Sequence, residues 1–164
     1  MAATYEPIAT TTVSGTSTTS VTFNSFSGYT DLIAVVNAGW NSGSDYQAFL
    51  LNGDTVWTSS YSSTWLDGDG SSARSGRYTN NGYGLMVPDP YDTTLNNHTI
   101  LHFMNYANTT TYKTILARNN NGLSGTSVSL YRSTSAITSI NFRGISSTAW
   151  KAGSTFTLYG IKAA

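Results

Sequence analysis

Apolar residues in this chain recur at every second position, in short runs separated by Gly, Ser and Asn. Side chains of a β-strand alternate between two faces, so this spacing predicts half-buried strands. No segment shows the 3.6-residue period of an amphipathic helix, and we expect none. Strands are expected at 5–13, 19–26, 31–39, 46–51, 54–59, 83–87, 97–106, 112–119, 126–132, 137–143 and 154–162.

The predicted fold is all-β: an antiparallel two-sheet β-sandwich, jelly-roll-like, with about ten strands. Segments 31–36 and 100–104 are apolar on both faces, so they are expected to be central strands covered on both sides or strands under a subunit contact. Asn52-Gly53 predicts a type I′ hairpin turn, since both residues tolerate positive φ. Three pairs are expected to point inward: Val21 with Phe23, Val128 with Leu130, and Phe156 with Leu158.

A chain of 164 residues is expected to form one domain. We assign residues 1–14 to an N-terminal arm or edge strand and residues 15–164 to a single β-sandwich. A globule of this size buries about 70% of the surface of its unfolded chain, so its core needs no staple. The chain has no Cys, which excludes disulfides, thiolate metal sites and a cysteine nucleophile.

Ser, Thr, Gly and Asn fill 78 positions, while only 16 carry a charge. So polar a chain with few aromatics would be disordered, but 21 aromatic residues can build a core. The surface is then covered by hydroxyls and amides, which is typical of a rigid β-protein working outside a cytosol. The net charge is zero, so no nucleic-acid partner is expected, and self-association is favoured.

The first residues contain neither a basic region nor an apolar run, so no signal peptide is expected. No stretch approaches the roughly 20 apolar residues of a membrane span, and no membrane partner is expected. We therefore expect a protein that folds in a cytosol and is exposed later, for instance by lysis.

Residues 59–82 are predicted to form a long loop, and such loops are usually functional or disordered. Because this segment contains Trp65, we expect it to be ordered by contact with its own domain or with a neighbour.

No metal site or cofactor is predicted. Asp67 and Asp69 resemble the start of a calcium loop, but too few further acids are near for the 6–8 oxygens that calcium takes, so a turn is favoured. His98 and His102 would lie about 13 Å apart on a strand, too far to share a metal. No nucleophile elbow, phosphate loop or dinucleotide fingerprint is present.

Seven Trp and Tyr residues fall within the 44 positions from Trp40 to Tyr83. They could fill the sandwich, since each ring buries 150–250 Å². They could also anchor a protein interface, where Tyr, Trp and Arg dominate the energetics. Finally, they could stack on sugars, and the candidates for that role are Trp40, Trp57, Trp65 and Tyr78.

Five segments are distinctive when taken together: TYEPIATTTV, LLNGDT, MNYANTTTYKTILARNN, LYRSTSAITSINF and the closing AGSTFTLYGIKAA. They resemble small β-rich structural proteins from the virion gene clusters of tailed phages, notably phages of cyanobacteria and other aquatic bacteria. The resemblance covers the start and most of 97–164, and region 55–95 departs from it. It implies a component of the virion and supplies no functional residues, because the matching motifs are strands and turns.

The first functional hypothesis is a non-enzymatic capsid decoration or cement protein, expected to be a homotrimer that bridges subunits of the major capsid protein. Its predicted contacts are Tyr5, Ile8, Trp57, Tyr61, Trp65, Arg74, Arg77 and Tyr78. The alternative is a tail-fibre or tail-tip module that binds host-surface carbohydrate. A third hypothesis, a depolymerase, is the weakest because no acid–base pair stands out.

Overall fold

The computed structural model describes residues 4–87, 95–120 and 122–162, and these form strands, turns and loops without a helix. Twelve strands are assigned within these ranges, in two sheets. The larger sheet has the order β1 (Tyr5–Thr12), β12 (Thr155–Ile161), β3 (Asp31–Ala38), β8 (Asn97–Phe103), β9 (Lys113–Asn120), β10 (Ser124–Tyr131), β5 (Tyr61–Gly68) and β6 (Ala73–Asn81). The smaller has the order β2 (Ser20–Asn24), β11 (Ser139–Gly144), β4 (Gln47–Leu51) and β7 (Gly84–Leu85).

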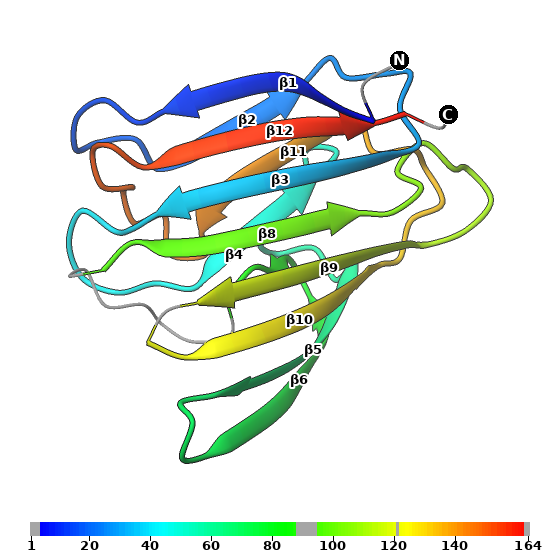
Figure 1. Cartoon of the computed structure of the whole chain (residues 1–164). Coiled ribbons are helices and arrows are strands. Elements are labelled where there is room, and N and C mark those ends of the chain that lie inside the picture. Colours follow the sequence, from blue (N-terminus) through cyan, green and yellow to red (C-terminus); the bar gives the residue numbers. More distant parts are fainter. Residues whose placement is uncertain (1–3, 88–94, 121, 163–164) are drawn as a thin grey trace.

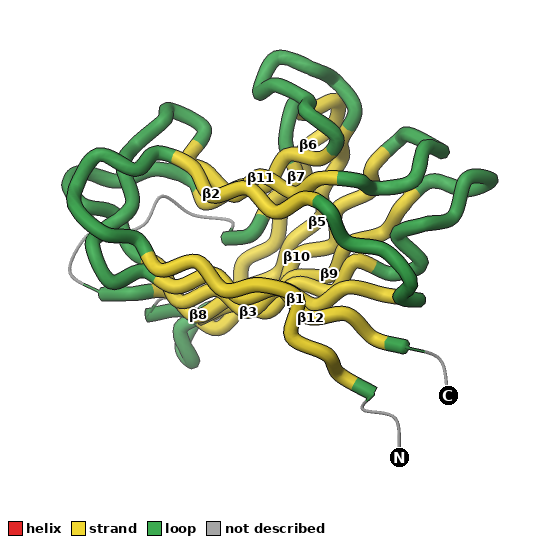
Figure 2. The backbone as a smooth tube through the Cα atoms, turned by 90° about the horizontal axis from the view of Figure 1, so that it is seen from above, coloured by secondary structure: helices red, strands yellow, loops and turns green. Residues whose placement is uncertain are grey.

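The two sheets pack face to face, and neighbouring strands within each are antiparallel (Figure 1). The chain passes repeatedly between the sheets, and the last two strands insert between early ones, β11 between β2 and β4 and β12 between β1 and β3. This confirms the predicted all-β fold with two antiparallel sheets packed as a sandwich. Figure 2 shows the larger sheet curving upward, so that β5 and β6 reach the level of the smaller sheet.

One hydrophobic core fills the space between the sheets, and aromatic rings dominate it. Trp40 and Trp150 are both fully buried and stack with ring centroids 4.1 Å apart. Phe49 contacts both Phe103 and Tyr61 edge to face. Many of the aromatic residues therefore fill the core of the sandwich, as one of the three alternatives predicts.

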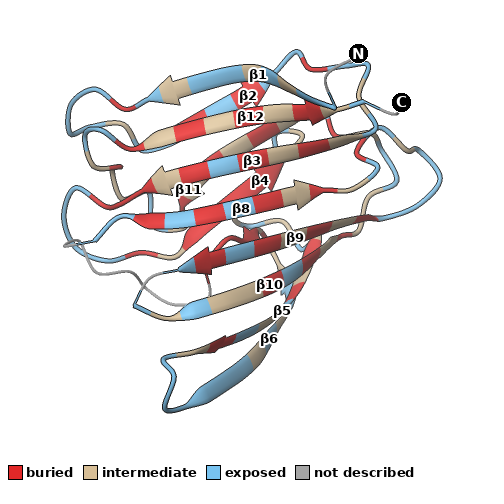
Figure 3. Ribbon diagram, in the orientation of Figure 1, coloured by how far each residue is buried: buried red, intermediate tan, exposed pale blue. Residues whose placement is uncertain are grey.

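The predicted inward pairs are confirmed in β2 and β12, where Val21, Phe23, Phe156 and Leu158 are all buried. Figure 3 shows the same alternation of buried and exposed positions along β3, β8 and β9. The central position predicted for segments 31–36 and 100–104 is also confirmed, because β3 and β8 are neighbours within the larger sheet. The prediction that both of their faces are covered is wrong, because Val35 and Ile100 on the outward side are more than a third exposed.

The inward prediction is wrong for β10, where Val128 is exposed and Leu130 is only partly buried. Ser127 and Ser129 point into the core instead. The cause is the short strand β7, which pairs on one side with β4 and needs partners for its other backbone groups. Ser129 Oγ accepts from the N–H of Leu85 at 3.1 Å, and Ser127 Oγ donates to the Leu85 carbonyl at 2.8 Å.

The prediction of a long loop at 59–82 is also wrong, because this segment contains the hairpin of β5 and β6. Its many Ser and Gly residues obscure the alternation of apolar and polar residues that marks a strand. One of these glycines, Gly76, is required by packing. A Cβ at Gly76 would lie 2.5 Å from the ring of Trp65, which covers that position. Conversely, the strand predicted at 54–59 is a loop with a turn.

The turn at Asn52-Gly53 has positive φ at both residues, 55° and 79°, as a type I′ turn requires. It does not lead into a paired strand, so the predicted hairpin does not form. The Asn52 side chain instead bonds the loop before β11, accepting from the N–H of Thr138 at 2.7 Å and donating to the carbonyl of Ala136 at 2.9 Å.

Candidate functional site

The side of the larger sheet that faces away from the smaller one is apolar over its central strands. We call it the outer sheet face. The strand pairing shows which residues share this face: Val35 lies opposite Ile100, and Leu116 lies opposite Val128. Val35, Ile100 and Val128 are 36%, 38% and 42% exposed. Its apolar members are Ile33, Val35, Leu66, Ile100, Leu116, Val128, Leu130 and Tyr159.

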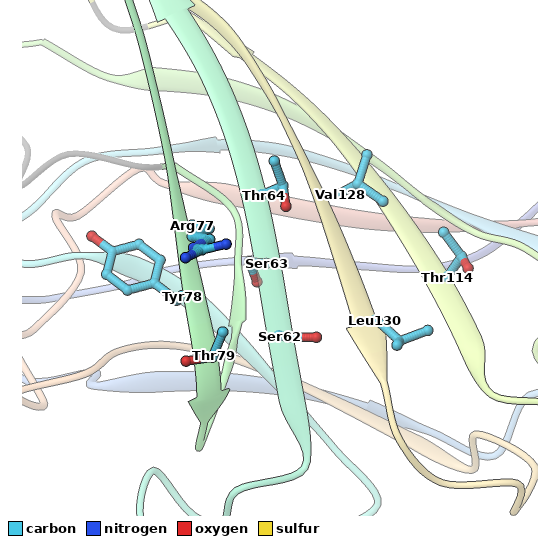
Figure 4. Close-up of a pocket in the computed structure, with 9 residues that line it drawn as sticks. All are labelled: Ser62, Ser63, Thr64, Arg77, Tyr78, Thr79, Thr114, Val128 and Leu130. Carbon is cyan, nitrogen blue, oxygen red and sulfur yellow. The ribbon is translucent and has the colours of Figure 1, made fainter.

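Two shallow hollows lie on the outer sheet face. The first, of about 420 Å³, is lined by Tyr5, Ile33, Val35, Ile100, Arg118 and Tyr159. The second, of about 350 Å³, spans β6, β5, β10 and β9 and includes Arg77, Thr64, Val128, Leu130 and Thr114 (Figure 4). A broad apolar surface with shallow hollows suits contact with another protein surface.

Polar side chains lie among the apolar ones on the outer sheet face, and one pair of them is bonded to each other. His102 Nε2 lies 2.7 Å from Asp31 Oδ2, and Asp31 Oδ1 accepts from the N–H of Asn105. His98 lies on the same strand, separated from His102 by Ile100. No group of three His, Asp or Glu side chains suited to a metal ion occurs within the described ranges.

The predicted interface residues divide between several places. Tyr5 is 57% exposed and belongs to a hollow of the outer sheet face, and Ile8 packs against the core from β1. Arg77 lies on the outer side of β6 opposite Thr64. The prediction is wrong for Tyr61, whose ring is fully buried against Phe49 and Tyr131.

Trp65, Arg74 and Tyr78 lie on the other side of the β5–β6 hairpin from Arg77, as the pairing of Ser63 with Tyr78 and of Asp67 with Arg74 requires. Figure 4 shows the Tyr78 ring directed away from the hollow. Arg74 holds both oxygens of the buried Asp67 carboxylate, at 2.8 and 2.9 Å. The residues that the sequence suggested as one site therefore lie on two opposite faces of the β5–β6 hairpin.

The favoured turn at Asp69 is confirmed. Asp69 Oδ1 accepts from the backbone N–H groups of Ser72 and Ser71, at 2.7 and 2.9 Å, and from the Ser71 hydroxyl. These bonds stabilise the ionised form, with the Ser72 bond contributing most, and lower the pKa of Asp69 to about 2. The Asp67 carboxylate thus links the two strands of the hairpin through Arg74, and the Asp69 carboxylate stabilises its turn.

A separate cavity of about 600 Å³ lies where the loop after β4 meets the loop after β11. We call it the Trp57 pocket. The Trp57 side chain on its rim is 90% exposed, the most open of the four Trp residues. The lining residues are Asp54, Thr55, Val56, Trp57, Arg143, Ile145, Ser146 and Ser147.

Hydrogen bonds fix the loop that carries Trp57. The Thr55 carbonyl accepts from the N–H and the hydroxyl of Thr58, at 3.0 and 2.9 Å. Gly82 packs against this loop so closely that a Cβ there would lie 2.0 Å from the Val56 carbonyl oxygen. The indole is therefore presented to solvent on an ordered turn.

The opposite wall is held by the buried Asp45. Its Oδ2 accepts from the N–H of Ser146 at 2.9 Å and from that of Thr148 at 3.4 Å. Arg143 donates through Nε to the Gly144 carbonyl at 3.0 Å and through Nη2 to the Ser147 hydroxyl. Ser147 has a φ of 62°, a conformation that non-glycine residues adopt rarely.

Asp54 lines the Trp57 pocket and also interacts with two tyrosines of the core. Its Oδ2 is buried without a hydrogen-bond partner among the described residues. Burial of Tyr61 raises the pKa of its hydroxyl, and the negative charge of Asp54 raises it further. The same two causes raise the pKa of Tyr131.

The predicted sugar platforms do not come together. Trp40 is fully buried, so its prediction as a sugar contact is wrong. Neither Trp65 nor Tyr78 lines the Trp57 pocket. Sequence reasoning missed Arg143 and the serines beside it, because nothing in the sequence indicates that two loops about ninety residues apart meet. The two-sided apolar segments 31–36 and 100–104 did signal the outer sheet face.

Within the part of the chain that the structure describes, no helix has the length and apolar character needed to cross a bilayer. No protein-family profile matches the chain, and no curated protein matches it. Among solved structures, the chain matches weakly a fructofuranosidase from Schwanniomyces occidentalis in complex with fructose, with a TM-score of 0.30 and 9% sequence identity. The match covers 99% of this chain and 35% of that enzyme's chain, and similarity at this level supports no functional argument.

Proposed function

We propose that this chain is a non-enzymatic structural protein of a tailed-phage virion, a decoration protein that binds the capsid and stabilises its shell. The observation that carries the proposal is the outer sheet face, an apolar surface formed by the central strands of the larger sheet. The resemblance of the strand and turn segments to small virion proteins supplies the setting.

Side chains on the outer sheet face support a protein contact. The solvated face of an antiparallel sheet normally carries polar residues. Here Val35 and Ile100 lie opposite each other on central strands and remain more than a third exposed. Burying such a surface is favourable by about 25 cal/mol for each Å² of apolar area.

The distribution of charge also suits this role. Arg118 and Arg77 stand beside the apolar positions, lining one hollow each. Arg is enriched in protein interfaces, where it combines a charge with a large contact area. The major capsid protein is the proposed partner, and the homotrimer expected of such a protein is part of the same proposal.

Stabilisation follows from mass action. A protein that binds the assembled shell, and not its separated subunits, shifts the equilibrium toward the shell. A contact that spans two neighbouring capsid subunits has this property, because only the assembled lattice offers both halves of the binding surface.

The proposal is tested by heating purified capsids with and without the protein. The expected result is a higher disruption temperature when the protein is bound. Equal disruption temperatures contradict the proposal. The alternative of a tail module that binds host carbohydrate lacks the four predicted sugar platforms as one surface, since Trp40 is buried.

A further inference from the structure

The Trp57 pocket has a chemistry that the outer sheet face lacks. Trp57 leaves nine tenths of its side chain in solvent, whereas Trp40 and Trp150 are fully buried. A large aromatic ring is favoured at a surface where a ligand covers it. Because two hydrogen bonds fix the backbone of the turn from Thr55 to Thr58, a ligand would not have to order this loop.

Beside the ring, the lining groups are mostly hydrogen-bonding ones. Asp54 offers a carboxylate, Arg143 a guanidinium, and Thr55, Ser146 and Ser147 hydroxyls. A ligand that suits this set has one apolar face for the indole and many hydroxyls around its edge. The cavity volume of about 600 Å³ falls within the range of about 300–1,000 Å³ of small-molecule sites.

The charges select among such ligands. The formal charges of Asp54 and Arg143 cancel, and Arg143 already donates to the Gly144 carbonyl and to the Ser147 hydroxyl. Because the two opposite charges cancel, the pocket has no net charge that would attract an ionic ligand of either sign. A neutral ligand does not need such an attraction.

From this arrangement we propose that the Trp57 pocket binds a neutral saccharide. A hexopyranose ring would stack its C–H face on Trp57, while its hydroxyls bond to Asp54, Arg143 and Ser146. Both walls are built in advance, one by the Thr55–Thr58 turn and the other by Asp45. This site is separate from the outer sheet face, so the inference does not depend on the proposed capsid contact.

Binding is tested with the whole chain on an array of immobilised neutral and acidic glycans, followed by titration with the neutral hits. Tryptophan fluorescence provides the second readout, because a sugar that covers Trp57 removes water from the most exposed indole. The expected result is saturable binding of at least one neutral saccharide, with emission moving to shorter wavelength.

Variants assign the binding to the pocket. Trp57→Ala is expected to abolish binding without loss of folding, because the side chain is exposed. Trp57→Phe keeps an aromatic platform and is expected to retain weaker binding, and Arg143→Lys to weaken binding about tenfold or more. Tyr112→Ala is the matched control, since Tyr112 is an exposed aromatic outside the pocket and its loss should change nothing.

Three outcomes would overturn the inference. The first is that no neutral saccharide binds on the array or in titration. The second is binding that Trp57→Ala leaves unchanged. The third is loss of capsid attachment in Trp57→Ala with no sugar binding in the original protein, which would make the ring a protein contact. Failure of the capsid proposal alone, with Trp57-dependent sugar binding intact, leaves this inference standing.

Discussion

The hydroxyl oxygens of Ser63 and Ser129 lie 2.8 Å apart in the interior, joining β5 to β10 where the larger sheet curves toward β7. Ser129 also accepts the N–H of Leu85. Since side chains alternate along a strand, the inward position of Ser129 places Val128 on the outer sheet face. A buried polar contact thereby determines which apolar residues lie on the outer sheet face.

The first prediction concerns Ser129. Ser129→Ala leaves the buried N–H of Leu85 without its acceptor and is expected to lower the free energy of unfolding by about 1–3 kcal/mol. Urea unfolding measures the change, and Ser124→Ala, at an exposed end of the same strand, is the control. Equal stability of both variants would show that the serine cluster does not hold β7.

The second prediction concerns Gly84, which faces a core ring. A Cβ at this position would lie 2.0 Å from Phe49 Cζ, so Gly84→Ala overpacks the core and is expected to cost about 1–3 kcal/mol. Thermal unfolding of the double variant Gly84→Ala/Phe49→Leu checks the cause. The two losses should be less than additive, because the smaller side chain relieves the overlap.

A third prediction links the core to the Trp57 pocket through Asp45. Asp45→Ala removes the acceptor for the N–H groups of Ser146 and Thr148 and is expected to lower the free energy of unfolding by about 1–3 kcal/mol. Backbone amide NMR shifts should change at Ser146 to Thr148 and stay constant in β6. Unchanged amide shifts in the 146–148 loop would contradict the role assigned to Asp45.

The fourth prediction concerns pH. The folded-state pKa of Asp69 is about 2, below the unfolded value of about 3.9. Its contribution to stability is therefore present above about pH 4 and is lost as the pH falls through about 2. Side-chain carboxyl NMR should give a midpoint near 2 for Asp69. A midpoint near 3.9 would mean that the turn does not hold the carboxylate in solution.

The fifth prediction concerns the outer sheet face. Replacing Val35, Ile100 and Val128 together by Thr keeps a high β-propensity and removes apolar surface. The variant is expected to fold and to lose most of its attachment to purified capsids in a sedimentation assay. Trp57→Ala is the control and should sediment with capsids as the original protein does. Full attachment of the triple variant would place the contact elsewhere.

The strands that the sequence predicts well are those with large apolar residues at every second position. Phe156 and Leu158 in β12 show this most plainly, since both are fully buried. The same rule failed in β10 because Ser127 and Ser129 serve the backbone of β7, whose residues lie over forty positions away. Nothing within the strand itself indicates that partner.

The β5–β6 hairpin was hidden for a related reason. Gly76 lowers the β-propensity of its strand, but the Trp65 ring requires the space that a side chain would take. The Trp57 pocket was hidden because Trp57 and Arg143 come together only when β4 and β11 pair. An exposed Trp and a buried one look the same in a sequence, as Trp57 and Trp40 demonstrate.

The central claim, attachment to a capsid shell, is tested most directly by the number of copies in a particle. Quantitative mass spectrometry of purified virions compares this chain with the major capsid protein. The account predicts a copy number in simple proportion to the capsid subunits, as the shell lattice would impose. A few copies per particle, as for a tail component, would contradict it.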